Sequence, residues 1–97
     1  MSDKNDIIEK LRSVKKILAE EYQITGVALF GSATKEKLSH ESDIDVLVDF
    51  NDRATLLDLV GAADFLEGLL GRKVDIVPRR ALRKELREQI ISEAIIV

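Results

Sequence analysis

The stretch that decides the fold is Phe30-Gly31-Ser32, then ten residues, then Asp43-Ile44-Asp45-Val46. An apolar run over residues 24–30 ends at the Gly-Ser pair, and a second apolar run begins with the two aspartates. Runs of this length and character are typical of buried β-strands. Because residues i and i+2 of a strand point to the same face of a sheet, we expect Asp43 and Asp45 to project side by side.

The Asp43–Asp45 pair has an electrostatic consequence. Two ionised carboxylates about 4 Å apart repel each other by roughly 4 kcal/mol at an effective dielectric constant near 20. A divalent cation removes this repulsion, and hard cations such as Mg²⁺ prefer oxygen ligands. The pair therefore predicts a metal site, although Asp-x-Asp alone is also typical of solvated charge at the end of a strand.

The spacing of apolar residues predicts the remaining elements. In chain order, these are a helix near residues 5–21, strands over 24–30 and 44–50, a helix near 54–70, a strand over 73–77, and a last helix marked by Leu82, Leu86 and Ile90. We interpret the leucine stripe over residues 56–70 as core. The apolar tail, residues 94–97, is expected to dock on the domain's own sheet or in a protein interface. This order indicates an α/β domain with a small sheet covered by helices.

The composition restricts the class of protein. The chain has 97 residues, 45% apolar and 34% charged, which fits one globular domain over residues 1–97. The net charge of −3 argues against binding nucleic acid through a basic surface. The chain has no cysteine and one histidine, which excludes thiolate metal sites and argues against a histidine-based zinc site. The polar N-terminus and the short apolar runs indicate a cytoplasmic protein without a membrane segment.

A third carboxylate, Asp75, lies between Val74 and Ile76 in the third expected strand. An aspartate in a short apolar strand indicates either an edge-strand charge or a functional group. Asp49 shares the face of Asp45 by parity, but it lies about 13 Å further along the strand. We therefore exclude Asp49 from the candidate metal site.

The Gly31-Ser32 pair completes the candidate site if the first two strands are antiparallel neighbours, because it then lies beside Asp43 and Asp45. Glycine allows close approach of a ligand, and free backbone N–H groups after the strand would bind an anion. Three carboxylates beside a phosphate-binding corner predict a Mg²⁺ site, with two ions, for a nucleoside triphosphate.

Three further features have two interpretations each. Lys35 is either an exposed loop charge or a phosphate contact, and His40 is either a solvated loop residue or a substrate contact. The basic residues Arg79, Arg80 and Arg83 indicate either a solvated helix start or a surface that contacts a partner or nucleotide.

These motifs, with Gly71-Arg72-Lys73-Val74-Asp75-Ile76-Val77, resemble the signature of the DNA polymerase β-like nucleotidyltransferase superfamily and, within it, the minimal nucleotidyltransferases. The resemblance covers about residues 5–95. It implies an α+β fold with a small mixed β-sheet flanked by helices. It also implies Mg²⁺-dependent transfer of a nucleoside monophosphate, with ATP as the expected substrate.

The resemblance also implies roles for single residues. Glu36 departs from it, because related proteins often carry glycine after the basic residue of this loop, which Lys35 would match. The implied catalytic and metal-binding residues are Asp43, Asp45 and Asp75, and the implied nucleotide-binding residues are Gly31, Ser32 and Lys35.

The resemblance further implies a protein partner. Minimal nucleotidyltransferases act as antitoxins that adenylylate a tyrosine of a HEPN-domain toxin, which predicts a type VII toxin–antitoxin system and a hetero-oligomer. The short chain leaves little room for a separate acceptor-binding domain, which also favours a protein acceptor over a small molecule. The alternative is a non-catalytic antitoxin that neutralises its toxin by binding alone.

Overall fold

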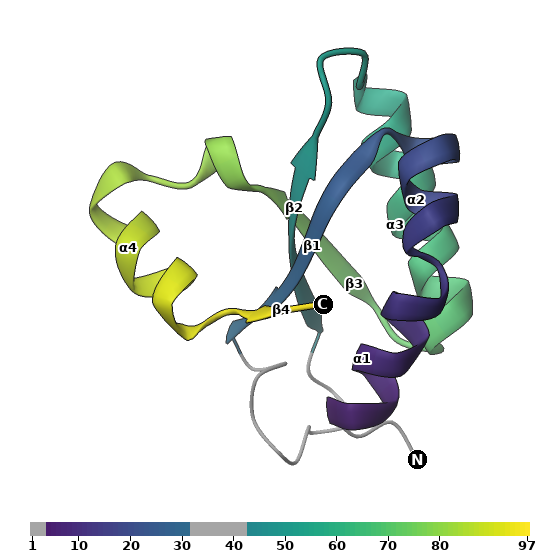
Figure 1. Ribbon diagram of the computed structural model, residues 1–97, viewed down its shortest axis with the longest axis horizontal. Helices are drawn as coiled ribbons and strands as arrows, with labels where there is room; N and C mark the ends of the chain where they lie inside the picture. The colour runs from purple at the N-terminus through teal and green to yellow at the C-terminus, as the bar shows by residue number, and fades with distance from the viewer. Residues whose placement is uncertain (1–3, 32–42) are drawn as a thin grey trace.

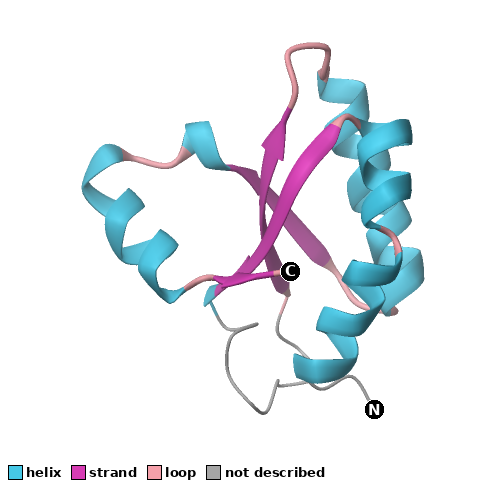
Figure 2. Ribbon diagram, viewed as in Figure 1, coloured by secondary structure: helices cyan, strands magenta, loops and turns pink. Residues whose placement is uncertain are grey.

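The computed structural model describes residues 4–31 and 43–97 as a sheet with helices on its two sides. Figure 1 shows α1, α2 and α3 together on one side and α4 on the other, and Figure 2 shows the same elements by type. The described elements are α1 (Lys4–Ser13), α2 (Lys15–Tyr22), β1 (Ile24–Phe30), β2 (Ile44–Phe50), α3 (Leu56–Leu70), β3 (Val74–Pro78), the 3₁₀ turn η2 (Arg79–Ala81), α4 (Lys84–Glu93) and β4 (Ile95–Ile96).

The strands form a mixed sheet in the order β3-β2-β1-β4. The β1–β2 and β1–β4 pairs are antiparallel, and the β2–β3 pair is parallel. The mixed sheet and the antiparallel first pair are therefore confirmed. In this register, Asp45 lies opposite Phe30 on one side and opposite Asp75 on the other.

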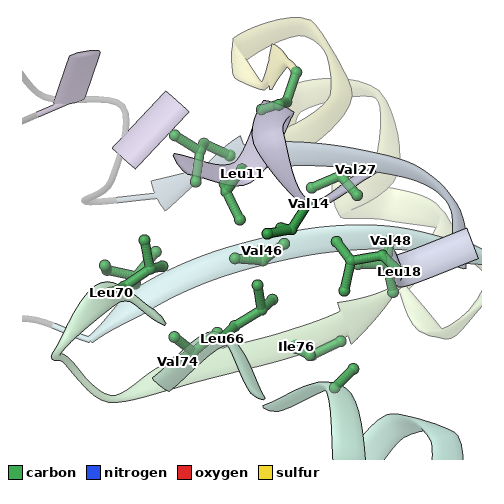
Figure 3. Close-up of a cluster of buried hydrophobic side chains, with 14 of the residues drawn as sticks. Leu11, Val14, Leu18, Val27, Val46, Val48, Leu66, Leu70, Val74 and Ile76 are labelled. Carbon is green, nitrogen blue, oxygen red and sulfur yellow. The ribbon is translucent and has the colours of Figure 1, made fainter. Parts of the chain in front are cut away.

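The hydrophobic core lies between the sheet and α1, α2 and α3, and Figure 3 shows part of it. On β2, the side chains of Ile44, Val46 and Val48 are buried. Because side chains alternate along a strand, burial of these three sends the intervening residues to the opposite face. The helices contribute Ile7, Leu11, Leu18, Ala62, Leu66 and Leu70 to the same cluster.

The single helix expected near residues 5–21 is wrong, because the chain breaks it at Val14 into α1 and α2. Val14 has φ −111° and ψ 8°, and its N–H donates to the carbonyl of Leu11 at 3.2 Å. The hydroxyl of Ser13 donates to the carbonyl of Lys10 at 2.6 Å, a local bond that competes with regular helix geometry. The apolar spacing continues through the break, since Val14 is itself buried, and periodicity therefore gives no sign of it.

The leucine stripe of α3 is core only in part. The helix begins at Leu56 after the N-cap Thr55, whose backbone N–H donates to the carboxylate of Asp58 at 2.8 Å. The first turn lies at the end of the helical layer, and the side chains of Leu56 and Val60 are exposed there. The interpretation of the whole stripe as core is therefore wrong at its N-terminal end.

The other boundaries differ little from expectation. β3 includes Pro78 as its last residue, which an edge strand tolerates because one side of it needs no N–H donor. The last helix, α4, begins at Lys84, so that Leu82 precedes it. No helix in residues 4–31 or 43–97 has the length and apolar character needed to cross a membrane.

The apolar tail docks on the domain's own sheet, which was one of its two expected positions; the other was a protein interface. Ile95 and Ile96 pair with Leu29 and Ala28 of β1. The buried Val97 follows them, and its N–H donates to the carbonyl of Val27 at 3.0 Å. The carbonyl of Val97 accepts a hydrogen bond from Lys15 Nζ at 2.9 Å, which ties the tail to α2.

Removal of the tail should destabilise the protein. Truncation after Glu93 exposes the pocket of Val97, whose side chain is 8% exposed, and deletes β4. We expect a loss of about 2 kcal/mol for one buried valine, or roughly 10 °C in Tm for a domain of this size. Thermal unfolding followed by circular dichroism measures it. Ile96→Ser is the control, because this side chain is 77% exposed and should change Tm little. An unchanged Tm in the truncated protein would contradict the docking.

Candidate functional site

The candidate site lies on the face of the sheet that points away from α1, α2 and α3. Since Ile44 and Val46 point into the core, Asp43 and Asp45 project from the opposite face of the chain at the start of β2. Asp75 lies on the same face, because its neighbours in β3 are buried and it is exposed. Alternation around a buried aliphatic pattern thus brings the three carboxylates, Asp43, Asp45 and Asp75, to one surface.

The register places the three carboxylates close in pairs. Asp45 and Asp75 are partners across the parallel β2–β3 pair. Asp43 precedes Asp45 by two residues on the same face. Asp45 is half-buried, whereas Asp43 and Asp75 are exposed. The expectation that these three residues share one surface agrees with this placement.

The three carboxylates interact electrostatically. The pKa of Asp45 is raised above its usual value of 3.8, first by burial and then by the negative charges of Asp75 and Asp43. Ionised Asp45 is therefore disfavoured in the protein alone. A cation beside it would reverse the sign of this interaction, because it favours the ionised form.

Gly31 gives the carboxylate of Asp45 its space. The residue has φ +65°, and a Cβ built on it would lie 2.6 Å from Asp45 Oδ2. Any other residue would therefore be strained in its backbone and would displace the carboxylate of Asp45. Gly26 has the same relation to Asp49, whose Oδ2 would lie 2.7 Å from an added Cβ. Sequence reasoning missed Gly26, although a glycine within a strand is a known sign of close approach.

These residues have the donor atoms that Mg²⁺ requires, but their side chains are not arranged around a single point. In residues 4–31 and 43–97, no three His, Cys, Asp or Glu side chains are already arranged to hold a metal ion. The three carboxylates nevertheless supply the hard oxygen donors that Mg²⁺ prefers, and burial with two nearby like charges raises the pKa of Asp45. The residues therefore fit a divalent cation that draws the side chains together when it binds.

Several residues named from the sequence lie elsewhere. Ser32, Lys35, Glu36 and His40 fall outside the described residues. Asp49 lies towards the other end of β2, where its Oδ1 is 3.3 Å from Arg79 Nε. Arg79 Nε is shielded from solvent but lacks a well-aligned hydrogen bond, so this pair is mainly an electrostatic contact. Both side chains are partly exposed, and the pair is worth at most about 1 kcal/mol.

Comparison with known proteins identifies the fold and the family. Residues 11–97 match the model of the nucleotidyltransferase domain. The chain belongs to the nucleotidyltransferase family. A Methanocaldococcus jannaschii protein, provisionally named a protein adenylyltransferase, is 36% identical to this nucleotidyltransferase over 96 residues, which cover 99% of the chain and 98% of the relative. The protein adenylyltransferase MntA of Thermococcus cleftensis is 31% identical over 94 residues, with 93% and 95% covered.

Solved structures share the fold of this nucleotidyltransferase. One, provisionally named a minimal nucleotidyltransferase, is 40% identical with a TM-score of 0.75, over 91% of this chain and 93% of that chain. A toxin–antitoxin structure with AMP-PNP contains a chain that matches with 25% identity and a TM-score of 0.68. The match covers 98% of this chain and 72% of that chain. The structure of a tri-AMPylated Shewanella oneidensis HEPN toxin in complex with MNT antitoxin contains a chain that matches with 25% identity and a TM-score of 0.59. The match covers 96% of this chain and 66% of that chain. The predicted nucleotidyltransferase fold is thus confirmed.

Gly31→Ala should destabilise the nucleotidyltransferase more than a matched change does. Gly71 also has a positive φ, +67°, but nothing lies within 4 Å of its added Cβ. Gly71→Ala therefore measures the backbone strain alone, about 1–2 kcal/mol. Gly31→Ala also displaces the carboxylate of Asp45, which is half-buried beside two like charges, so its loss of unfolding free energy should be moderately larger. Urea unfolding of the two variants measures the difference, and equal losses would contradict the close approach of Gly31 to Asp45.

Asp45→Asn should stabilise the protein when no divalent cation is present. The raised pKa means that the ionised form of Asp45 opposes folding at neutral pH, and asparagine removes the charge at nearly constant volume. We expect a higher Tm in the presence of EDTA. Asp64→Asn, on the exposed side of α3, is the control and should leave Tm nearly unchanged. A lower Tm for Asp45→Asn would show that Asp45 has a stabilising partner instead.

Proposed function

We propose that this nucleotidyltransferase transfers AMP from ATP to a protein acceptor in a Mg²⁺-dependent reaction. The observation that carries the proposal is the pairing of Asp45 with Asp75 across β2 and β3, with the charge of Asp43 beside them. Such carboxylates on adjacent strands fit a site for cations and a triphosphate. The names of the relatives, which are protein adenylyltransferases, support a protein as the acceptor.

The proposed reaction is a substitution at the α-phosphorus of ATP. The acceptor hydroxyl oxygen bonds to the α-phosphorus, the bond from this phosphorus to the pyrophosphate oxygen breaks, and pyrophosphate leaves. We assign Asp75 as the group that takes the hydroxyl proton, because it is the exposed carboxylate on the edge strand. Bound Mg²⁺, in two ions, would supply charge neutralisation of the triphosphate.

The chain's own residues would position the reactants. Asp43, Asp45 and Asp75 would hold the ions, and Gly31 keeps the surface beside Asp45 free of a side chain. Ser32 and Lys35 are proposed to bind phosphate oxygens, and that assignment rests on the sequence pattern and the resemblance. Positioning and charge are the main contributions that a protein makes to phosphoryl chemistry.

The proposed acceptor is a tyrosine of a HEPN-domain toxin encoded beside this chain. The similarity to a complex of an AMPylated HEPN toxin with its antitoxin supports this choice. The chain would then be the antitoxin of a type VII system. It would act in the cytoplasm as one minimal domain over residues 1–97 and as part of a hetero-oligomer, without direct binding to nucleic acid.

Loss of two carboxylates should abolish transfer. Asp43→Asn combined with Asp45→Asn removes two charges and almost no volume, so nucleotidyl transfer should fall by at least about 1,000-fold. The toxin is incubated with ATP, Mg²⁺ and each form of the chain, and its intact mass is measured. We expect the added mass of AMP with the wild-type chain and no added mass with the double variant.

Asp49→Asn is the matched control, because Asp49 is on the same strand but pairs with Arg79 away from the three carboxylates. It should retain transfer. The same samples report neutralisation of the toxin. If the wild-type chain adds no mass, and wild type and double variant neutralise the toxin equally, the protein is a binding-only antitoxin and the catalytic proposal fails.

A further inference from the structure

The first turns of α3 expose large aliphatic side chains. Leu56 is 75% exposed, Leu57 is 82% exposed and Val60 is 51% exposed. Residues three and four apart on a helix are neighbours, so these three side chains form one surface, here called the α3 patch. Single exposed leucines are ordinary, but three within about one turn of a small domain indicate an interaction site.

The α3 patch is held rigidly. Asp58 caps the start of the helix through the N–H of Thr55 at 2.8 Å. One turn later, the ring of Tyr22 packs against Gly61, where an added Cβ would lie 3.0 Å from the ring. The same ring stacks on Phe65 with centroids 5.6 Å apart. A preordered surface loses little conformational entropy when a partner binds.

The α3 patch lies apart from the three carboxylates. They are at the start of β2, whereas α3 follows the end of this strand, and seven strand residues span about 20 Å. The patch also belongs to the helical layer, and the carboxylates point away from that layer. The nucleotide site therefore does not account for the exposed leucines.

The charges around the α3 patch favour one kind of partner. The exposed charged residues that lie close to the patch in the chain, or precede the Tyr22 packed on α3, are mostly acidic. Asp52 and Arg53 precede the helix, Asp64 is one turn beyond Val60, and Glu20 and Glu21 precede the Tyr22 that packs on α3. A second copy would bring the same acidic border against itself, because a two-fold interface pairs identical patches. An apolar surface bordered by lysine and arginine is complementary instead.

We propose that the α3 patch is the docking surface for the acceptor protein, which would present an apolar surface bordered by basic residues. This inference rests on the proposed function for the identity of the acceptor. The acceptor would then span both surfaces, because it docks at the α3 patch while its reacting hydroxyl reaches the three carboxylates about 20 Å away. Affinity for the acceptor and transfer of AMP should therefore be separable by mutation.

The test measures the Kd of the purified HEPN-domain acceptor for variants of Leu57. Leu57→Lys should raise Kd at least about tenfold, because it removes apolar contact and adds a charge of the partner's sign. Leu57→Glu removes the same contact but adds the complementary charge, so its Kd should rise less. Ile96→Ser is the control, since Ile96 is equally exposed on β4, far along the sheet from the patch. It should leave Kd unchanged.

Three readouts separate docking from other effects. Leu57→Lys should have the Tm of the wild type, and ATP with Mg²⁺ should raise that Tm as it does for the wild type. The Asp43→Asn, Asp45→Asn double variant should bind the acceptor with the affinity of the wild type. The inference is overturned if Leu57→Lys and Leu56→Ser both bind the acceptor with the Kd of the wild type. It is also overturned if the wild-type chain sediments as a homodimer and Leu57→Lys sediments as a monomer. If the wild-type chain transfers no AMP but Leu57→Lys still loses the acceptor, the proposed function fails and the docking surface stands.

Discussion

The alternation of side chains along β2 is the constraint on which the rest of the structure depends. Ile44, Val46 and Val48 pack under the helices, and this packing sends Asp43 and Asp45 to the opposite face. A slip of one residue would place the carboxylates in the core and the aliphatic groups in solvent. The hydrophobic effect therefore fixes the position of the charges, although it acts on their neighbours. Burial of Val74 and Ile76 in the parallel strand β3 likewise sends Asp75 to this face, opposite Asp45.

The carboxylates of the candidate site repel one another in the folded protein. Burial and two like charges raise the pKa of Asp45, and Gly31 adopts a left-handed conformation beside it. The charges oppose stability in the absence of a ligand, and the core beneath the sheet offsets them, whereas glycine adopts the left-handed conformation without strain. Such local conflict is expected where a protein keeps groups for binding rather than for folding. The pairing of Gly26 with Asp49 shows that β1 makes room for a second carboxylate, which Arg79 neutralises.

Much of this arrangement could be predicted from the sequence, because strong local patterns determine it. The apolar runs of β1 and β2 gave their bounds directly, and the lone Asp75 in a short apolar strand indicated the third carboxylate. The break at Val14 could not be predicted, since the residue keeps the apolar spacing while its backbone leaves the helix. Exposure of Leu56 depends on where the helical layer ends, which is a tertiary property. The roles of Ser32 and Lys35 stay predictions, because these residues lie outside the described part of the chain.

The short strand β4 has a consequence for solubility. Without it, the apolar β1 would be an open edge whose backbone groups could pair with another chain. β4 covers part of that edge with two residues, a length too small to serve as a template for a further strand. At the opposite edge, β3 ends in Pro78, which cannot donate to a neighbouring strand. The sheet thus limits edge-to-edge pairing differently at its two edges, because a two-residue strand covers part of one edge and a proline ends the strand at the other.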